Sequence, residues 1–409
     1  MRIRTAAALI TLSAMAVAAC GSDESSSEDT AADTAGDSTT GTEAPAETAA
    51  DTAGDTSAGT EPMVETDTDT DVVAGEPFPE ARCAQNEAAG TITYLTGFDF
   101  AAAASIIDVI VAEDQGYYDD LCLDVELLPS FSTANYPLIA ENQAQFSSGG
   151  SFSEVVAFAD ANDAEFVIMA VDGRTAIDAL IVKPGEAATL EDLESTTIGV
   201  KGKLPASIEV MLSEAGLVEG ENFDTVLLDG FDPTAHIAID AIVGFPGWKS
   251  NEPGALDRAG IPYDLFDPLD YDIPGSFGII YTSQTFVSDH PTAAEDFMRA
   301  TMLGLNTAIA DPVAAAATAV ELINGGGNPN FLSPEGETFR WETDSALIVA
   351  TTPDGVGFGV PDPEALQFEL DTYSTTGMFG DGDVPDAASR LGVDIMATIY
   401  DGTVVIWPG

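Results

Sequence analysis

From about residue 91 onward, short β-rich runs alternate with helical segments, and this alternation restricts the fold more than any other feature. The run 91–96 precedes a helical segment over 101–115, which carries apolar residues on one side and stops at Gly116. The run 123–128 then alternates apolar and polar residues as a strand does. Strands that alternate with helices form mainly parallel sheets with helices on both faces. The sequence therefore predicts an α/β fold.

A second set of strands and helices begins after a Lys-Pro-Gly break at 183–185. The β-rich run 277–281 is predicted to return to the first sheet. An inserted second set gives two lobes, and we assign 86–182 plus 276–409 to lobe 1 and 183–275 to lobe 2. A cleft between two lobes is a favoured ligand site, and such lobes close on a ligand by a hinge motion.

The chain is strongly acidic, and this charge excludes several classes of partner. It has 12 Lys and Arg against 70 Asp and Glu in 409 residues, a formal net charge of -58. Nucleic acids and anionic lipids both require a basic surface, so we expect no nucleic-acid partner and no docking through a basic patch. The two histidines, His236 and His290, leave little room for a histidine-rich metal site. We expect neither a metal nor a cofactor.

Residues 1–20 have the features of a bacterial export signal. Arg2 and Arg4 form the charged start, and the apolar run that follows is too short to span a bilayer. The four residues that end at Cys20 (VAAC) resemble a lipobox, in which the cysteine carries the lipid. A lipid on Cys20 would anchor the mature protein at the outer face of the cytoplasmic membrane. The alternative is a secretory signal that is cleaved off, with an incidental cysteine.

From Gly21 to about residue 85 the composition shifts to Asp, Glu, Thr, Ala, Gly and Ser, and the first basic residue is Arg82. A low-complexity segment of one charge sign buries too little apolar surface to fold. We therefore predict a disordered acidic linker over 21–85.

Three cysteines are too few for a disulfide-stapled scaffold. Cys83 and Cys122 each precede one of the first two predicted strands. If these strands are neighbours, both cysteines lie at the same end of the sheet. Export to an oxidising space permits a disulfide, so we predict that these two cysteines pair.

Ligands of α/β sheets bind beyond the carboxyl ends of the strands, so the candidate ligand-binding residues are those on the corresponding loops. They are Phe98, Asp99, Phe100, Ser148, Gly149, Ser151, Arg174, Lys203, Trp248, Asn251 and Glu252. The three aromatic residues among them could sandwich a flat ring. The alternative is that they only pack the lobes together.

The polar candidates fit two kinds of ligand. The Ser/Gly turn over 147–151 offers backbone N–H groups to an anion or a carbonyl, unless it serves only as a tight turn and helix cap. Asp99 and Glu252 suit a ring amine, although Glu252 could simply be a first-turn carboxylate of a helix. Arg174 and Lys203 suit an anion, with solvent exposure or ion pairing as the alternative.

Several motifs, in order along 91–310, resemble the NMT1/THI5-like substrate-binding proteins of ABC importers, which are type II periplasmic binding proteins. They are QGYYDD at 115–120, FSSGGS at 146–151, GFDP at 230–233, NEP at 251–253 and FMRA at 297–300. The stretch 325–409 matches only loosely. No cysteine follows Cys122, so the cysteine cluster of the family's eukaryotic synthase branch is missing.

The resemblance implies a two-lobed type II periplasmic-binding-protein fold and an extracytoplasmic protein that captures a small molecule and delivers it to an ABC permease. The aromatic residues together with Asn251 and Glu252 resemble the subset that binds flat nitrogen heterocycles, such as a pyrimidine precursor of thiamine. The alternative ligands are nitrate, sulfonates and taurine-type anions, which family members bind through helix N-termini and basic groups. Arg174 and Lys203 would serve that case.

Enzyme motifs are missing from the chain. The run GGSFS at 149–153 departs from the Gly-x-Ser-x-Gly elbow, and there is neither a His-Glu-x-x-His motif nor a Walker loop. We therefore expect a monomeric binding module with no catalytic residue. The remaining alternatives are an enzyme, such as a hydrolase or a pyrimidine synthase, and a surface lipoprotein with an adhesive or sensory role.

Overall fold

The computed structural model describes residues 70–327, 332–380 and 382–409, all of which belong to one compact unit spanning Thr66–Gly409. The predicted export signal, Cys20 and most of the predicted linker lie outside the described residues. In the part of the chain that is described, no single helix is long and apolar enough to cross a membrane. The bent pair of helices α10 (Pro291–Ala310) and α11 (Pro312–Gly326) passes that test only when the two are taken together.

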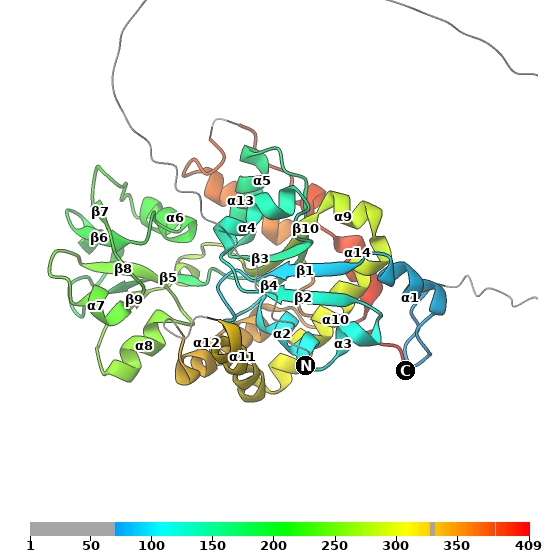
Figure 1. Cartoon of the computed structure of the whole chain (residues 1–409). Coiled ribbons are helices and arrows are strands. Elements are labelled where there is room, and N and C mark those ends of the chain that lie inside the picture. Colours follow the sequence, from blue (N-terminus) through cyan, green and yellow to red (C-terminus); the bar gives the residue numbers. More distant parts are fainter. Residues whose placement is uncertain (1–69, 328–331, 381) are drawn as a thin grey trace, which may run out of the picture. The chain divides into compact units, whose positions relative to one another are not determined.

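The first lobe is built on a five-stranded mixed sheet (Figure 1) with the order β2-β1-β3-β10-β4. Its strands are β1 (Thr91–Leu95), β2 (Asp124–Leu128), β3 (Phe146–Gly149), β4 (Phe166–Gly173) and β10 (Phe277–Ser283). β1 is parallel to β2 and β3, whereas β10 runs antiparallel to both β3 and β4. The chain returns from the second lobe through β10, which explains its reversed direction.

The second lobe contains the other five-stranded sheet, with the order β7-β6-β8-β5-β9. Its strands are β5 (Asp178–Val182), β6 (Thr197–Val200), β7 (Asp224–Leu227), β8 (Gly244–Trp248) and β9 (Asp264–Phe266). β5 runs antiparallel to β8 and β9, so it belongs to this sheet although the boundary expected from the sequence lay after residue 182. The predicted two-lobed α/β fold is confirmed, with sheets that are mixed rather than mainly parallel.

Helices flank both sheets. Lobe 1 carries α1 (Glu80–Glu87), α2 (Ile107–Asp114), α3 (Tyr117–Asp120), α4 (Ser132–Ala140), α5 (Phe152–Ala161), α9 (Gln284–Asp289), α10 (Pro291–Ala310), α11 (Pro312–Gly326), α12 (Pro334–Thr351), α13 (Pro363–Ser374) and α14 (Val393–Ile399). Lobe 2 carries α6 (Ala206–Glu214), α7 (Pro233–Ile237) and α8 (Glu252–Ala259). Short 3₁₀ helices lie at Leu190–Leu193, Pro268–Tyr271 and Ala387–Arg390, and β11 (Tyr400–Asp401) pairs with β12 (Val404–Val405).

The core of lobe 1 lies between its sheet and α10. Phe297 of α10 stacks on Phe146 with ring centroids 4.0 Å apart and on Tyr118 at 5.2 Å. Trp341 of α12 is fully buried and its Nε1–H donates to the carbonyl of Ala308 at 2.9 Å. The hydrogen bond joins α12 to α10, and α12 in turn reaches the cleft between the lobes.

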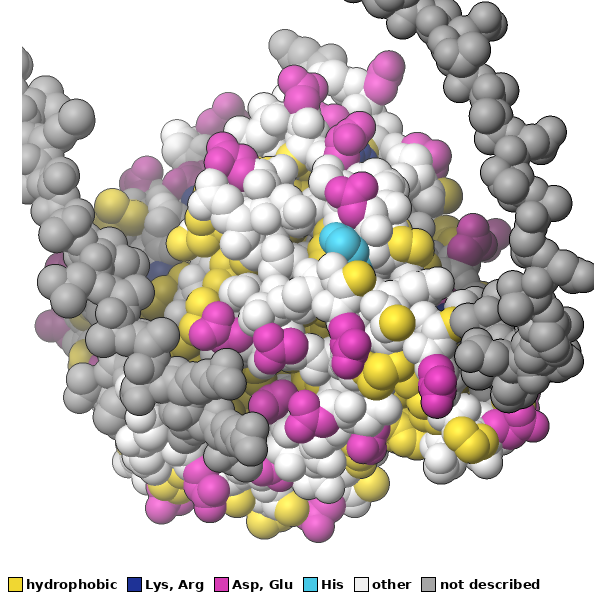
Figure 2. Space-filling view, turned by 45° about the vertical axis from the view of Figure 1, so that its right-hand side comes forward, with side chains coloured by type: hydrophobic (Ala, Val, Ile, Leu, Met, Phe, Trp, Pro, Cys, Tyr) yellow, Lys and Arg dark blue, Asp and Glu magenta, His cyan; other side chains and the backbone are white. Residues whose placement is uncertain are grey.

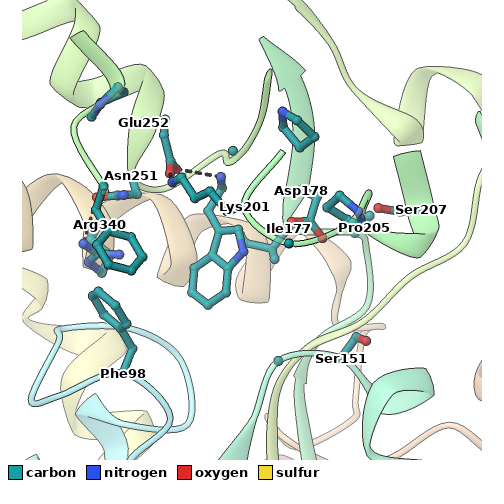
Figure 3. Close-up of a pocket in the computed structure, with 18 of the residues that line it drawn as sticks. Phe98, Ser151, Ile177, Asp178, Lys201, Pro205, Ser207, Asn251, Glu252 and Arg340 are labelled. Carbon is teal, nitrogen blue, oxygen red and sulfur yellow. Dashed lines mark hydrogen bonds and ion pairs between the residues drawn. The ribbon is translucent and has the colours of Figure 1, made fainter. Parts of the chain in front are cut away.

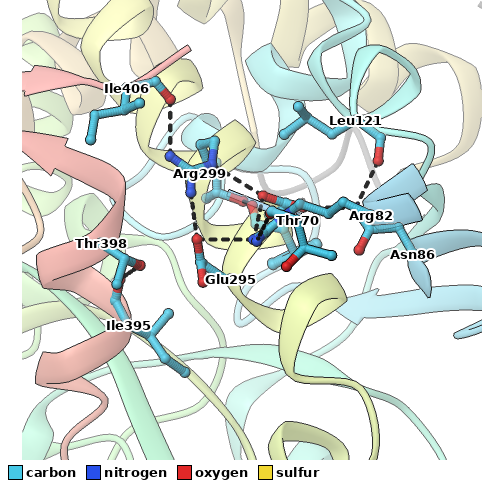
Figure 4. A network of polar contacts seen from close by, with 12 residues as sticks. Thr70, Arg82, Asn86, Leu121, Glu295, Arg299, Ile395, Thr398 and Ile406 are labelled. Carbon is cyan, nitrogen blue, oxygen red and sulfur yellow. Dashed lines mark hydrogen bonds and ion pairs between the residues drawn. The ribbon is translucent and has the colours of Figure 1, made fainter. Parts of the chain in front are cut away.

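A buried network of charges holds the N-terminal helix α1 to lobe 1 (Figure 4). Arg82 Nε lies 2.6 Å from Asp296 Oδ2, and its Nη2 lies 2.9 Å from Glu295. Arg299 pairs with the same two carboxylates and donates to the carbonyl of Ile406. We call Arg82, Glu295, Asp296 and Arg299 the tether network. Because of it, the folded part begins before residue 86, inside the segment expected to be linker.

The predicted disulfide is present beside this network. Cys83 of α1 is bonded to Cys122, just before β2, with their Cα atoms 5.3 Å apart. The pairing of β1 with β2 as parallel neighbours places the two cysteines at one end of the sheet, as the sequence argument required.

Candidate functional site: a cleft between the two lobes

A cleft of about 600 Å³ lies between the lobes and is lined by residues from both of them. Lobe 1 contributes Phe98 from the loop after β1, the turn after β3 and parts of α12 and α13. Lobe 2 contributes Asp178, the loop before α6, Phe231 and the segment from Pro246 to Glu252. The loops after strands form much of this wall, as expected for an α/β sheet. Figure 3 shows the two ends of the cleft, with Phe98 and Arg340 at one and Asp178, Pro205 and Ser207 at the other.

Three aromatic residues form one end of the cleft. Phe98 of lobe 1 contacts the ring of Phe231 of lobe 2 edge to face, at 6.1 Å between centroids. Trp248, at the end of β8, is half-buried and packs against the core of lobe 1. The Lys201 ammonium lies 5.5 Å from the Phe231 ring centre, within reach of a cation–π interaction. A flat ring could stack here in place of one of these aromatic contacts.

Glu252 is fully engaged by protein groups rather than free for a ligand. Its Oε1 accepts from Lys201 Nζ at 2.7 Å, and its Oε2 accepts from the backbone N–H of Trp248 at 2.8 Å. This geometry requires Gly247, because a Cβ there would lie 2.9 Å from the Glu252 side chain. Glu252 therefore fixes the position of Trp248 and Lys201.

Arg340 of α12 organises the same end of the cleft. It is 3% exposed, and its Nη2 donates to Asn251 Oδ1 at 2.8 Å. Glu337, one turn earlier, lies 3.3 Å from its Nε. The guanidinium carbon is 5.9 Å from the Phe98 ring centre. Arg340 thus links α12 of lobe 1 to Asn251 of lobe 2.

The opposite end of the cleft is polar and acidic. Asp178 is half-buried, and burial raises the pKa of its carboxyl to about 7, with Glu154 and Glu252 adding to the rise and Lys249 opposing it. Glu154 is exposed to the cleft but surrounded by protein, so desolvation raises its pKa as well. Neither carboxylate forms an ion pair within the described residues. Both can therefore accept hydrogen bonds from a ligand.

Basic side chains gather in the cleft of an otherwise acidic molecule. Figure 2 shows acidic side chains spread over one face, with little Lys or Arg visible. Arg2 and Arg4 lie outside the described residues, and of the other ten Lys and Arg, four line the cleft. Lys201 and Arg340 are paired as given above. Lys203 and Arg258 are exposed and form no ion pair within the described residues.

The Ser/Gly turn after β3 acts as a helix cap. Ser151 is the N-cap of α5 and accepts from the N–H of Glu154 at 3.3 Å. The N–H of Phe152 donates to Ser276 Oγ at 2.8 Å, and the N–H of Ser153 donates to Glu369 Oε1 at 3.0 Å. The first helical N–H groups of α5 are therefore occupied by protein acceptors. A ligand anion would find no free N–H at these three positions.

A small chamber of about 40 Å³ shares Phe98 and Trp248 with the lining of the cleft. Ser148, Gly149 and Asp344 line it, and burial raises the pKa of Asp344 to about 6. The backbone of the loop over 101–105 is held there by carboxylates: Ala104 N–H donates to Asp344, Ser105 N–H to Asp172 and Ala102 N–H to Glu337. These N–H groups, too, are already satisfied.

The structure brings together eight of the eleven predicted ligand-binding residues. Phe98, Ser151, Lys203, Trp248, Asn251 and Glu252 line the main cleft, and Ser148 and Gly149 line the small chamber beside it.

The other three predicted residues lie elsewhere. Phe100 is packed in the core of lobe 1 because the loop after β1 turns inward. Asp99 is buried and accepts from the backbone N–H of Phe100. Arg174 donates to the carbonyl of Val360 and lies 3.6 Å from Asp362, away from the main cleft.

Sequence reasoning missed several lining residues. Arg340 and Tyr373 come from the C-terminal part, whose resemblance to the family was loose, and no local pattern marks them as cleft residues. Phe231 stands within the GFDP motif at 230–233, so the motif itself was a signal. Glu154 lies in the first turn of α5, the helix capped by Ser151, and also lines the cleft.

Comparison with known proteins identifies the family. The NMT1/THI5 like family model matches residues 103–315, slightly more than half of the chain. The chain belongs to the NMT1/THI5-like family. The riboflavin-binding protein RibY of Chloroflexus aurantiacus is 28% identical over 128 residues, which are 31% of this chain and 36% of that protein. The chain thus matches about a third of the length of this curated relative.

Solved structures agree with the family. The periplasmic aliphatic sulphonate binding protein SsuA of Escherichia coli superposes with a TM-score of 0.56 at 11% identity, covering 73% of this chain and 91% of that one. The periplasmic nitrate-binding protein NrtA of Synechocystis superposes with a TM-score of 0.54 at 14% identity, covering 75% and 87%. At these identities the likeness establishes the fold, which is that of the periplasmic binding proteins.

Proposed function

We propose that this protein is the extracytoplasmic solute-binding component of an ABC importer. The observation that carries the proposal is the cleft of about 600 Å³ lined by both lobes, with aromatic side chains at one end and, at the other, carboxylates that have no ion pair within the described residues. Closure of the lobes on a small molecule and delivery to a permease require no covalent chemistry, no cofactor and no second subunit. The RibY, SsuA and NrtA resemblances support this class of function.

The proposed location is the outer face of the cytoplasmic membrane. The lipobox at Cys20 would supply the anchor, and the acidic segment after it would link the anchor to the lobes. The disulfide between Cys83 and Cys122 fits an oxidising, extracytoplasmic compartment. The permease of the same importer would be the protein partner.

For the ligand we propose a flat nitrogen heterocycle, either a thiamine pyrimidine precursor or the isoalloxazine ring of riboflavin, the compound named for RibY. Phe98, Phe231 and Trp248 offer stacking surfaces, and a cleft of about 600 Å³ is of the size that holds drug-sized ligands. An anion is disfavoured at α5, because the first N–H groups of this helix already donate to protein acceptors.

The second candidate is a sulfonate- or nitrate-type anion, as named for SsuA and NrtA. Lys203 favours it, because this exposed lysine lacks an ion pair within the described residues and precedes α6, whose N-cap Pro205 supplies no side-chain cap. A helix N-terminus beside a cation is a suitable anion site.

A thermal-shift screen of the full-length protein tests the proposal. The panel contains riboflavin, thiamine pyrimidines, taurine, alkanesulfonates and nitrate. A ligand at 100-fold its Kd adds about 2.7 kcal/mol of stability. We expect a heterocycle to raise the Tm and Trp248→Ala to abolish that rise, while Phe368→Ala, an exposed aromatic outside the cleft, leaves it unchanged. A rise with an anion that Lys203→Ala removes would replace the heterocycle; no rise with any compound would contradict the proposal.

A further inference from the structure

The acidic end of the cleft contains two carboxylates that have no basic partner within the described residues. Asp178 of β5 and Glu154 of α5 come from different lobes and both line the cleft. Neither forms an ion pair within the described residues, in contrast to Glu252 and Glu337, which are paired with Lys201 and Arg340. Within one cleft, therefore, two acids are paired with a basic side chain and two are not.

A buried hydroxyl at the same end supports this observation independently. Ser207, in the first turn of α6, is 3% exposed, and its Oγ makes no hydrogen bond within the described part of the chain. The hydroxyl of Tyr373 donates its proton to the carbonyl of Pro274 at 2.7 Å, so toward a ligand it can act only as an acceptor. A buried polar atom without a partner costs about 1–3 kcal/mol. A polar group of a ligand in this end of the cleft would remove that cost. Ser207 lies at the same end as Asp178 in Figure 3.

We infer that the ligand is a flat ring that bears a substituent rich in hydrogen-bond donors, hydroxyl or amine, and that Asp178, Glu154 and Ser207 bind this substituent. The inference rests on the proposed function and adds to it the chemistry of the ligand's second half. The ring lies at the aromatic end, near Phe98 and Trp248, and the substituent extends to the acidic end.

Carboxylates select for donors because each oxygen accepts hydrogen bonds and neither donates when ionised. A pair of hydroxyls can donate one hydrogen bond to each of the two acids, and a single amine can donate to both. A phosphate on the substituent would meet two like charges, and Lys203 offers one exposed ammonium against them. The acidic end therefore selects the unphosphorylated form of a ligand.

Matched pairs of probes test the inference at pH 8, above the pKa of about 7 of Asp178. Riboflavin has the ring and a hydroxylated chain, lumichrome has the ring alone, and FMN adds a phosphate to the chain. For amines, 4-amino-5-aminomethyl-2-methylpyrimidine is compared with 4-amino-2,5-dimethylpyrimidine. Calorimetry on the full-length protein gives each Kd. We expect the donor-bearing member of at least one pair to bind at least about tenfold more tightly than its ring-only partner, and riboflavin more tightly than FMN.

The variants assign the effect to the acidic end. Asp178→Asn with Glu154→Gln should reduce the preference for the donor-bearing probe to less than about twofold, with the Kd of the ring-only probe unchanged. Glu154→Gln alone, at an exposed position that tolerates the change, should reduce the preference partially, and Ser207→Ala should weaken only the donor-bearing probe. Asp289→Asn, on α9 and outside the cleft, is the control and should change nothing.

Different failures have different meanings. If ring-only and donor-bearing probes bind equally, or if the preference survives in the double variant, the inference is wrong while the proposed heterocycle function stands. Tighter binding of FMN than of riboflavin, lost in Lys203→Ala, also overturns it and favours an anion site. If no probe of either pair binds, the heterocycle proposal fails and this inference fails with it.

Discussion

The tether network and the cleft use the same kinds of charged side chain in opposite ways. In the tether network, Arg82 and Arg299 share the carboxylates of Glu295 and Asp296, and the guanidinium groups and Asp296 are almost fully buried. In the cleft, Glu154, Asp178, Lys203 and Arg258 stand without ion pairs within the described residues. Buried charges that pair with one another hold a structure in place. Charges without an ion pair in an accessible cleft can bind another molecule. The contrast predicts that changes in the first region alter stability and changes in the second alter binding.

The largest expected effect comes from breaking the tether network. Asp296→Ala removes the acceptor for Arg82, Arg299 and the amide of Asn86, and leaves two buried guanidinium groups short of a partner. We expect a loss of about 3–5 kcal/mol in the free energy of unfolding. Urea denaturation measures it. Glu295→Gln, at a carboxylate that is 20% exposed, should cost clearly less. A loss below about 1 kcal/mol in Asp296→Ala would mean that the network does not lock α1.

The disulfide beside the network gives the next largest effect. It closes a loop with a sequence separation of 39 residues, and the loss of such a link destabilises a protein by about 2–4 kcal/mol. We expect Cys83→Ser with Cys122→Ser to lower the free energy of unfolding by this amount and leave the ligand Kd unchanged. Reduction of the wild type with a phosphine should reproduce the loss. Equal stability of the oxidised and reduced protein would contradict the prediction.

Buried carboxyl groups that have no ion pair make the stability of the folded protein depend on pH. Burial raises the pKa of Asp108 and Asp178 to about 7 and that of Asp344 to about 6, all above the value near 4 of an unfolded chain. The folded protein therefore holds protons that the unfolded chain has released, and stability falls as the pH rises from about 4 to 7. Each group that keeps its proton contributes up to about 1.4 kcal/mol per pH unit.

Thermal melts between pH 5 and pH 8 check this prediction, and the Tm should be higher at pH 5. Asp108→Asn, at a fully buried site outside the cleft, should flatten the dependence, whereas Asp224→Asn on the exposed β7 strand should not. A Tm that rises toward pH 8 would show that the buried carboxyls are ionised in the folded protein without cost.

The smallest expected effect on stability comes from an unpaired cation of the cleft. Lys203 is exposed and forms no ion pair within the described residues, so Lys203→Ala should change the free energy of unfolding by less than about 0.5 kcal/mol. Under the proposed function it should also leave the riboflavin Kd within about twofold. Denaturation and calorimetry test the two statements separately. A large loss of affinity for the heterocycle would place Lys203 in direct contact with it.

The fold was predictable because it follows from local hydrophobic patterns and from the order of strands and helices along the chain. The β-rich run at 91–96 and the return at 277–281 appear as β1 and β10 of the first sheet. The lobe boundary was placed less well, because β5 follows β4 after a short crossing and nothing in its composition reveals which sheet it joins. Its antiparallel pairing with β8 and β9 depends on tertiary contacts.

The candidate site was predictable where motifs lie on loops after strands, as with Phe98, Lys203 and Trp248. The prediction failed at Asp99 and Phe100, because a loop sequence does not show which side chains turn into the core. The contributions of Arg340 and Tyr373 depend on how two late helices pack back against the cleft. Such contacts link residues far apart in the chain, and no local pattern encodes them.

The position of β10 in the first sheet determines when that sheet can be completed. β10 lies between β3 and β4, so these strands lack their shared neighbour until residues 277–283 have been supplied. The second sheet uses only strands between Asp178 and Phe266, a continuous stretch of chain. Pairing between distant segments slows folding because the loop between them must close first. The second lobe is therefore expected to fold early, whereas the sheet of the first lobe stays incomplete until β10 has been supplied, and its unpaired strands are open to proteases until then.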